Sequence, residues 1–337
     1  MPIAASSQIQ DLLADVAAPK GQEGLESTLP RGGVVYLPIE PAGYPVTPED
    51  FDFGGGSPTK EQIANASQFA QLVNQIPNSL QNTWVSTGRM TWNLWEAVLD
   101  SIQFPVGAPA NQITDLRAGF QLDKRLDMLG NTYYQTNYTP QEFWKTTSSA
   151  WHRMSYSASS GTLTEDNVKV KRPRILAGDK PEVDLPVDAK GMNVTGDLIL
   201  VTLLRPWWNA WLFESQNWRY APGSITPPLS DGGDPPSGAM TMYPNAIMVA
   251  RDVNVRLDMS SPRNRRLVKE ADAAHDVSFG PFQLKGNNAH AGSLLRETKL
   301  EVTNDGLKSI GMQVVGFQCN LLPQCPNPST AVTWPLM

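Results

Sequence analysis

The second half of the chain is a succession of short β-type segments separated by turns rich in glycine and proline. Residues 198–204 are almost entirely apolar, which predicts a strand buried on both faces, and residues 247–258 alternate between apolar and polar. Residues 299–303 and 313–321 have the same β-type composition. Strands at this spacing are typical of antiparallel sheets. The pattern therefore predicts an antiparallel β-sandwich over the C-terminal two thirds of the chain.

The first 56 residues are rich in proline and acidic side chains, which predicts little regular structure. Seven prolines fall between positions 19 and 58, and residues 1–110 carry eleven acidic against four basic side chains. A short helix over residues 9–18 and a strand over residues 34–39 are predicted within this stretch. Because the strand residues are apolar, we interpret residues 1–56 as an extended arm that lies on a protein surface.

Two helices are predicted over residues 57–110. Ser57 is the expected N-cap and Pro58 the first residue of a helix that ends before Pro77. A second apolar periodicity runs over residues 80–104 and includes three tryptophans at core spacing. The short turn between the two segments predicts an αα-hairpin.

Residues 111–143 show a looser pattern. Apolar residues fit helical spacing as far as Leu129, and Gly130 with Asn131 is the expected stop. The tyrosine- and threonine-rich run that follows is either a strand or a binding loop. Residues 111–337 are interpreted as a mainly β domain packed on the helices. The chain as a whole is therefore predicted to be one continuous α+β unit with an N-terminal arm and a helical hairpin.

Known catalytic and cofactor motifs are missing from the sequence. It contains no GxSxG and no GxGxxG, and the run from Gly54 to Lys60 departs from the phosphate-loop spacing. Its three histidines, at 152, 275 and 290, show no metal-ligand spacing. No catalytic residue, metal or cofactor is predicted. A net charge of −6 also argues against a nucleic-acid partner, since such binding depends on neutralising phosphates.

Aromatic and basic residues are concentrated in positions 205–220, directly after the most apolar strand. Four of the ten tryptophans and two arginines lie in these sixteen residues. Indole faces beside arginine and asparagine are suited to contacts with sugar rings, bases or an aromatic subunit interface, and they also occur as core clusters. The candidate binding residues are Arg205, Trp207, Trp208, Trp211, Trp218, Arg219 and Tyr220.

Two further features leave alternatives open. Cys319 and Cys325 are spaced either for a small disulfide loop or as two independent thiols. Residues 144–163 interleave many hydroxyl side chains with aromatic ones. In composition this run resembles the membrane-inserting hairpins of pore-forming toxins, and an exposed face of an ordinary sheet gives the same pattern.

The leading functional hypothesis is a non-catalytic structural, assembly or binding protein. It would self-associate as a homo-oligomer through the arm or the aromatic patch, and its partner would be a carbohydrate or a protein. The alternatives are a pore-forming or membrane-active protein without a signal peptide, and a glycan hydrolase using a carboxylate such as Glu214. The first residues lack the features of a secretory signal, and no apolar run reaches spanning length, which predicts a cytoplasmic protein or one released without a signal peptide.

Overall fold

The computed structural model describes residues 33–39, 43–145, 150–157, 167–171, 182–188, 190–288 and 296–335. Thirteen strands in these ranges form one antiparallel sheet, and six others form three two-stranded sheets. The helix expected over residues 9–18 lies outside the described residues.

The bounds of the elements are as follows. The strands of the large sheet are β1 (Val34–Pro38), β2 (Tyr44–Val46), β8 (Asn137–Thr139), β9 (His152–Ser157), β10 (Asn167–Lys171), β11 (Glu182–Pro186), β12 (Asn193–Leu204), β14 (Met242–Arg256), β15 (Asp276–Phe279), β16 (Phe282–Asn288), β17 (Arg296–Thr303), β18 (Gly306–Ile310) and β19 (Met312–Leu321). The small sheets pair β3 (Gln75–Pro77) with β4 (Ser86–Met90), β5 (Ile102–Gln103) with β13 (Arg219–Tyr220), and β6 (Lys124–Leu126) with β7 (Thr132–Tyr134). The helices are α2 (Lys60–Val73), α3 (Thr91–Ser101), α4 (Gln112–Leu122) and α5 (Pro262–Ala273), with 3-10 turns η1 (Pro48–Phe51) and η2 (Ala210–Glu214).

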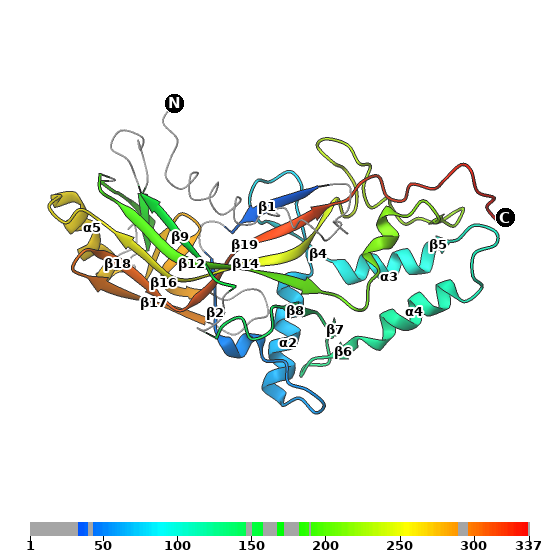
Figure 1. Cartoon of the computed structure of the whole chain (residues 1–337), viewed down its shortest axis with the longest axis horizontal. Coiled ribbons are helices and arrows are strands. Elements are labelled where there is room, and N and C mark those ends of the chain that lie inside the picture. The colour runs from blue at the N-terminus through cyan, green and yellow to red at the C-terminus, as the bar shows by residue number, and fades with distance from the viewer. Residues whose placement is uncertain are drawn as a thin grey trace, which may run out of the picture.

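Strand β14 is a central strand of the large sheet and is paired along both of its edges. It pairs with β12 along one edge and, along the other, first with β19 and then with β18 (Figure 1). The sheet continues from β18 through β17, β16, β15 and β10 to β11. Antiparallel pairing and the α+β class are thus confirmed. A sandwich of two separate sheets is not, because these strands belong to one hydrogen-bonded sheet.

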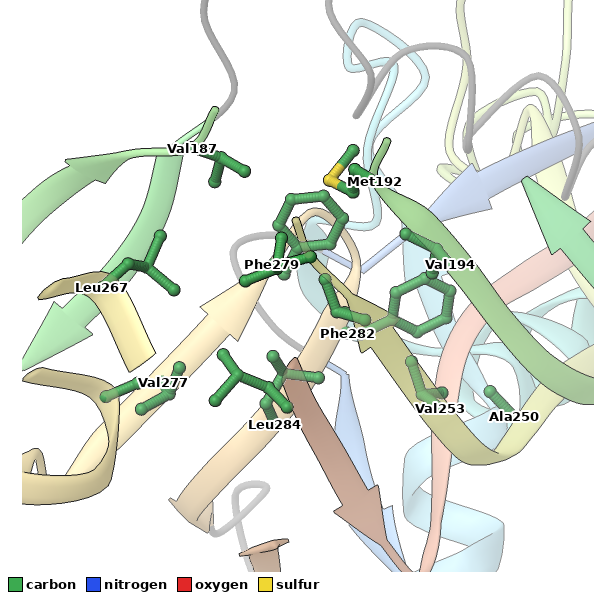
Figure 2. Close-up of a cluster of buried hydrophobic side chains, with 14 of the residues drawn as sticks. Val187, Met192, Val194, Ala250, Val253, Leu267, Val277, Phe279, Phe282 and Leu284 are labelled. Atoms are coloured by element: carbon green, nitrogen blue, oxygen red, sulfur yellow. The ribbon is translucent and has the colours of Figure 1, made fainter. Parts of the chain in front are cut away.

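The outer strands of this sheet and α5 enclose one hydrophobic core. Phe279 and Phe282 lie at its centre between β12, β14 and Leu267 of α5 (Figure 2). The alternation at the end of β14 explains the arrangement, since Val253 and Val255 are fully buried while Asp252, Asn254 and Arg256 are not. Strand β12 is buried less completely than its sequence predicts, because Leu204 at its end is exposed.

Part of the expected arm belongs to the sheet. The predicted strand at residues 34–39 is confirmed as β1, which pairs with β19, and β2 pairs with the start of β19. Phe51 of η1 packs edge-on against Phe69 of α2 and Tyr138 of β8 in a second core. Residues 33–39 and 43–53 are therefore packed against the rest of the molecule.

The helical region differs from the prediction in three respects. Helix α2 is capped by Thr59, not Ser57, because the Thr59 hydroxyl accepts from the Gln62 N–H while the Gln62 side chain accepts from the Thr59 N–H. The expected αα turn is wrong, since the strands β3 and β4 separate α2 from α3. Gly130, with φ of 82°, lies in the β6–β7 turn instead of ending a helix.

Helices α3 and α4 lie at the end of the molecule opposite α5 (Figure 1). Trp92, Trp95 and Leu99 form the buried stripe of α3. Arg117 of α4 donates to the Leu99 carbonyl at 2.8 Å, which ties α4 to α3. Together with residues 207–229 these helices form a third core. In the described part of the chain, no helix is both long enough and apolar enough to cross a membrane.

Candidate functional site

A groove with a volume of about 570 Å³ lies between α4, Trp95 of α3 and the segment 206–212. The segment follows β12, and Pro206 prevents the strand from continuing as a regular ladder. We call this site the aromatic groove. Its lining residues are Trp95, Pro109, Asn111, Gln112, Asp115, Leu116, Gly119, Pro206, Trp207, Trp208, Asn209, Trp211 and Leu212.

Arg205 precedes the segment that forms the groove wall and anchors it to the end of α2, without lining the groove itself. Its guanidinium is buried and donates from Nε to Asn74 Oδ1 at 2.6 Å and from Nη2 to the Val73 carbonyl at 2.8 Å. These acceptors lie at the C-terminal end of α2, where the helix dipole favours a cation. Burial lowers the pKa of Arg205 to about 10, so the side chain is still charged at neutral pH. The guanidinium also lies 5.3 Å from the Trp208 ring centre.

The wall is held by contacts between aromatic rings. Trp207 and Trp208 meet edge to face with centroids 5.6 Å apart, and Trp208 packs in the same way on Phe213 at 5.1 Å and Tyr243 at 4.7 Å. Trp95 meets Phe213 at 5.6 Å. Such edge-to-face pairs are favourable and restrict the ring orientations. The groove is therefore formed by side chains that other residues hold in place.

Three of the seven predicted binding residues line this groove, namely Trp207, Trp208 and Trp211. Trp211 is 68% exposed, so its ring is available to a ligand. Arg205 lies behind the wall, as described above. The structure thus brings part of the expected patch to one surface and uses the rest elsewhere.

Trp218, Arg219 and Tyr220 do not line the groove. Trp218 is fully buried and donates its indole N–H to the Leu212 carbonyl at 2.6 Å. Arg219 and Tyr220 form β13, which pairs with β5, and Arg219 stacks over Trp334 at 4.9 Å. These three residues consolidate the fold around the C-terminal segment.

The sequence analysis missed the opposite wall of the groove. Asn111, Gln112 and Asp115 of the α4 region line it together with Trp95. Asn111 donates to an Asp115 carboxylate oxygen at 2.7 Å. The signal was present in the sequence, because positions 111, 112 and 115 fall on one side of a helix. Nothing in the sequence, however, places that side opposite residues 206–212.

Two lining residues of this groove, Trp95 and Trp207, have indole N–H groups without an acceptor among the described residues. Both side chains are almost completely buried. Buried N–H groups are nearly always hydrogen-bonded, because an unmade bond costs about 1–3 kcal/mol. The buried Trp218 indole, which has its carbonyl acceptor, follows that rule. Both nitrogens are buried beneath the groove surface and are not open to a ligand, and buried polar atoms of Asn65, Asn245 and Gln283 are in the same state.

A second cavity, of about 510 Å³, lies beside η1 and β8. Glu49, Asp52 and Glu142 contribute carboxylates to its lining, next to Phe53 and Trp144. Asp52 already accepts from the Gln62 side chain and the Gly54 N–H, which hold its pKa below the usual value. Glu142 accepts from Lys145 at 2.6 Å. The carboxylates of Asp52 and Glu142 are therefore engaged within the protein.

Other groups of the described residues offer little reactivity. Cys319 and Cys325 are both free and buried, and burial raises the pKa of both thiols, that of Cys325 to about 12. Glu214, the carboxylate considered for glycan hydrolysis, is not a lining residue of the aromatic groove. No group of three or more His, Cys, Asp or Glu side chains is arranged to hold a metal ion within the ranges that the structure describes.

Much of the hydroxyl-rich run at residues 144–163 lies outside the described residues. Residues 152–157 form β9, which pairs with β12 from Asn193 to Leu198. This part of the run is therefore integrated in the large sheet.

Comparisons of this chain with protein-family models, with curated proteins and with solved structures found no match in any of the three.

Proposed function

We propose that this chain is a non-catalytic binding protein whose ligand occupies the aromatic groove. The observation that carries the proposal is the exposed indole of Trp211, which lines a groove whose aromatic wall is held in place by other side chains.

The packing of the groove supports the same proposal. Its aromatic wall is held by Arg205, Phe213 and Tyr243, so that little side-chain ordering remains to be paid for when a ligand binds. At the rim, Trp211 offers an exposed indole. Apolar walls with a few fixed polar groups are typical of small-molecule and oligomer sites.

The carboxylate content of the groove favours binding over hydrolysis. Glycosidic cleavage by the usual mechanisms needs two carboxyl groups about 5–9.5 Å apart. Among the described residues that line the groove, Asp115 is the one acid. The Asp115 carboxylate accepts a hydrogen bond from the Asn111 side chain. This arrangement is suited to holding a ligand hydroxyl, but it provides no second acid for hydrolysis.

Ligand binding can be tested with the full chain labelled with 5-fluorotryptophan. Carbohydrates, peptides and small carboxylic acids are added in turn, and ¹⁹F resonances are assigned from single Trp→Phe variants. We expect a ligand to shift the resonances of Trp207 and Trp211 and to leave that of Trp218 in place. The proposal fails if no compound of the three classes shifts the groove resonances more than that of Trp218.

Trp211→Ala provides the matching loss-of-binding variant. Because the ring is exposed, its removal should weaken ligand binding without changing the unfolding midpoint. Ile225→Ala is the control, since Ile225 is 99% exposed and outside the groove lining. Equal binding by the two variants would show that the groove is not the site.

Self-association is a second candidate function, and a specific surface favours it. The end of α4 and the β6–β7 hairpin expose Leu122, Leu126, Met128 and Leu129 within eight residues, Leu129 at 87%. Exposed clusters of large apolar side chains often mark contact surfaces. The test is light scattering on the full chain, in which Leu126→Ser/Leu129→Ser should lower the mass of an oligomer and Ile225→Ser should not. A monomer over the whole accessible concentration range would contradict this function.

A further inference from the structure

We infer that the aromatic groove is occupied by residues 9–18 of the same chain, docked as a short helix. The inference rests on the proposed binding function of the groove and names the partner. Residues 9–18 lie outside the described residues. Their sequence, the lining of the groove and the place where the described chain begins support this assignment.

Residues 9–18 carry the apolar pattern of a helix that binds in a groove. Large apolar side chains stand at positions i, i+3, i+4 and i+7, namely Ile9, Leu12, Leu13 and Val16. Asp11 and Asp15 fall on the opposite side of the same helix. A segment of this length is shorter than the about 12–15 residues that an isolated helix needs in water. A partner surface is therefore required for the helix that the sequence predicts.

The lining of the groove suits an apolar helix face. Leu116 and Trp208 are half-buried and Trp211 is 68% exposed, so apolar surface on both sides of the groove is open to a partner. No Lys, Arg or His is among the described lining residues, and Asp115 is the one acid among them. The uncharged stripe of residues 9–18 would therefore bury no charge in the groove, while its two acids would face water.

Gly119 independently indicates that a second backbone approaches α4 closely. It lies inside α4 and lines the groove. Apart from its two neighbours and the backbone of its own helix, a Cβ atom at this position would meet no atom within 4 Å, so the described fold does not require a glycine. Glycine inside a helix is also less favourable than alanine. A docked helix that needs the space of a side chain accounts for the glycine.

The described chain begins close to the groove. Val34, the first residue of β1, lies beside Asn320 of β19, and Asn320 lies beside Tyr243 of β14. The Tyr243 ring packs at 4.7 Å on the Trp208 ring of the groove wall. Because neighbouring strands lie about 5 Å apart, the start of β1 is on the order of 20 Å from this wall.

The intervening chain is long enough to reach the groove of its own molecule. Residues 19–33 can span at most about 50 Å, which exceeds the distance from the start of β1 to the groove wall. Attachment within one chain also raises the concentration of the segment at the groove above that of a second copy in dilute solution. The partner is therefore assigned to the same molecule.

Paramagnetic broadening in the full chain tests the inference. Ala14→Cys, on the outer side of the expected helix, carries a nitroxide, and the native Cys319 and Cys325 are buried away from the labelling reagent. In chain that also contains 5-fluorotryptophan, we expect the nitroxide to broaden the ¹⁹F resonance of Trp211. The resonance of Trp151, which lies beside the middle of β12, is the internal control. Broadening of Trp211 no greater than that of Trp151 would overturn the inference.

A mixed sample distinguishes the same chain from a second copy. Nitroxide-labelled chain without fluorine is mixed with fluorinated chain without nitroxide. Absence of broadening in the mixture supports docking within one molecule. Broadening of Trp211 as strong as in the doubly labelled chain would overturn the assignment to the same molecule.

Leu12→Glu/Leu13→Glu should release the segment from the groove. Two charges in the apolar stripe oppose its burial, so the ¹⁹F resonance of Trp211 should shift. Gln10→Glu/Ala14→Glu is the matched control, because it adds the same charge away from the stripe. A synthetic peptide of residues 5–20, added to Leu12→Glu/Leu13→Glu, should restore the original resonance. Identical Trp211 resonances in the two variants and the unsubstituted chain would contradict docking.

Gly119→Ala tests the close approach to α4. When the segment is released by Leu12→Glu/Leu13→Glu, alanine occupies open space and should raise the urea midpoint. In the otherwise unsubstituted chain the added methyl group meets the docked helix, so the midpoint should rise less or fall. An equal rise in both backgrounds would show that no helix packs against Gly119.

The outcomes separate this inference from the proposed function. If neither the nitroxide nor Leu12→Glu/Leu13→Glu affects Trp211, the segment is not the partner, and the groove remains a binding site wherever an added compound shifts its resonances. If the segment docks and no added compound shifts the groove resonances of Leu12→Glu/Leu13→Glu, the groove serves its own chain and the external ligand is overturned.

Discussion

The Nε–H of Arg205 donates to Oδ1 of Asn74 at 2.6 Å, across 131 positions of sequence. The same amide accepts from the Thr91 hydroxyl at 3.1 Å and donates to Thr136 at 2.8 Å and to the Ala70 carbonyl at 2.7 Å. One buried side chain therefore joins the end of α2, the start of α3 and the end of β12. The position of the groove wall depends on this hydrogen-bond network around Asn74.

Asn74→Ala should destabilise the fold strongly. The substitution leaves the buried guanidinium of Arg205 without its side-chain acceptor, and an unsatisfied buried donor costs about 1–3 kcal/mol, or more when it is charged. Urea unfolding followed by tryptophan fluorescence measures the loss. Asn78→Ala is the control, because Asn78 Oδ1 accepts from the exposed Leu80 N–H and the loss of this bond should cost about 1 kcal/mol. Equal losses of unfolding free energy in the two variants would show that the hydrogen-bond network around Asn74 is not important for stability.

Replacing two buried tryptophans by phenylalanine should have unequal effects. Trp218→Phe removes an indole N–H that bonds the Leu212 carbonyl, whereas Trp207→Phe removes one that has no acceptor among the described residues. Both changes remove the same atoms, so Trp218→Phe should cost about 1–2 kcal/mol more in unfolding free energy. If Trp207→Phe were the more damaging, its indole N–H would have to be bonded in the free protein.

Thr59→Ala should weaken α2, and Ser57→Ala should not. Thr59 and Gln62 form the capping box that satisfies two backbone N–H groups, and the loss of such a cap costs about 1 kcal/mol. Ser57 is exposed and precedes the cap by two residues. Thermal unfolding of the two variants distinguishes the observed N-cap from the one expected from the sequence, and a lower midpoint for Ser57→Ala would contradict the structure.

Stability should fall as the pH rises above about 8.5. Burial raises the pKa of Cys319 and Cys325 above the unfolded value of about 8.5, that of Cys325 to about 12. Between these values the unfolded chain releases the thiol protons and the folded chain retains them, so each thiol contributes about 1.4 kcal/mol of loss per pH unit. Urea midpoints at pH 7.0, 8.5 and 9.5 measure the slope.

The control for this pH dependence is Cys319→Ala/Cys325→Ala. Without thiols the decline between pH 8.5 and 9.5 should be flatter, although the variant starts from a lower stability because both sites are buried. An identical slope in both proteins would mean that other groups cause the decline. Rapid reaction of the native thiols with a disulfide reagent at pH 8 would contradict their burial.

Local patterns in the sequence predicted much of the fold correctly. The alternation at residues 247–258 and the apolar composition of residues 313–321 lie in β14 and β19, and residues 34–39 contain β1. The β3–β4 hairpin was missed because Trp84 fits the helical periodicity of the residues that follow it. Its burial comes instead from stacking on Phe317 at 3.7 Å, a contact between residues far apart in sequence. The single connected sheet was missed for a similar reason, since pairings between distant strands leave no local pattern.

The candidate site was predictable only in its aromatic half. Residues 207–211 are conspicuous because tryptophans are rare and here they follow an apolar strand. Asp115 and Asn111 belong to an ordinary polar helix face, and only the packing of α4 on α3 through Arg117 brings them opposite the indoles. The unsatisfied N–H of Trp95 could not be foreseen, since it depends on which carbonyls happen to lie near it.

The pairing of β1 with β19 places a constraint on biosynthesis. Tyr36 of β1 donates its hydroxyl to the Val315 carbonyl, 279 positions later in the chain. At about 5–20 residues per second, a ribosome needs about 14–56 seconds to reach that partner. During this interval the apolar residues Val35 and Leu37 lack β19, the strand with which β1 pairs. Chaperone binding to a nascent chain is therefore expected to concentrate near β1.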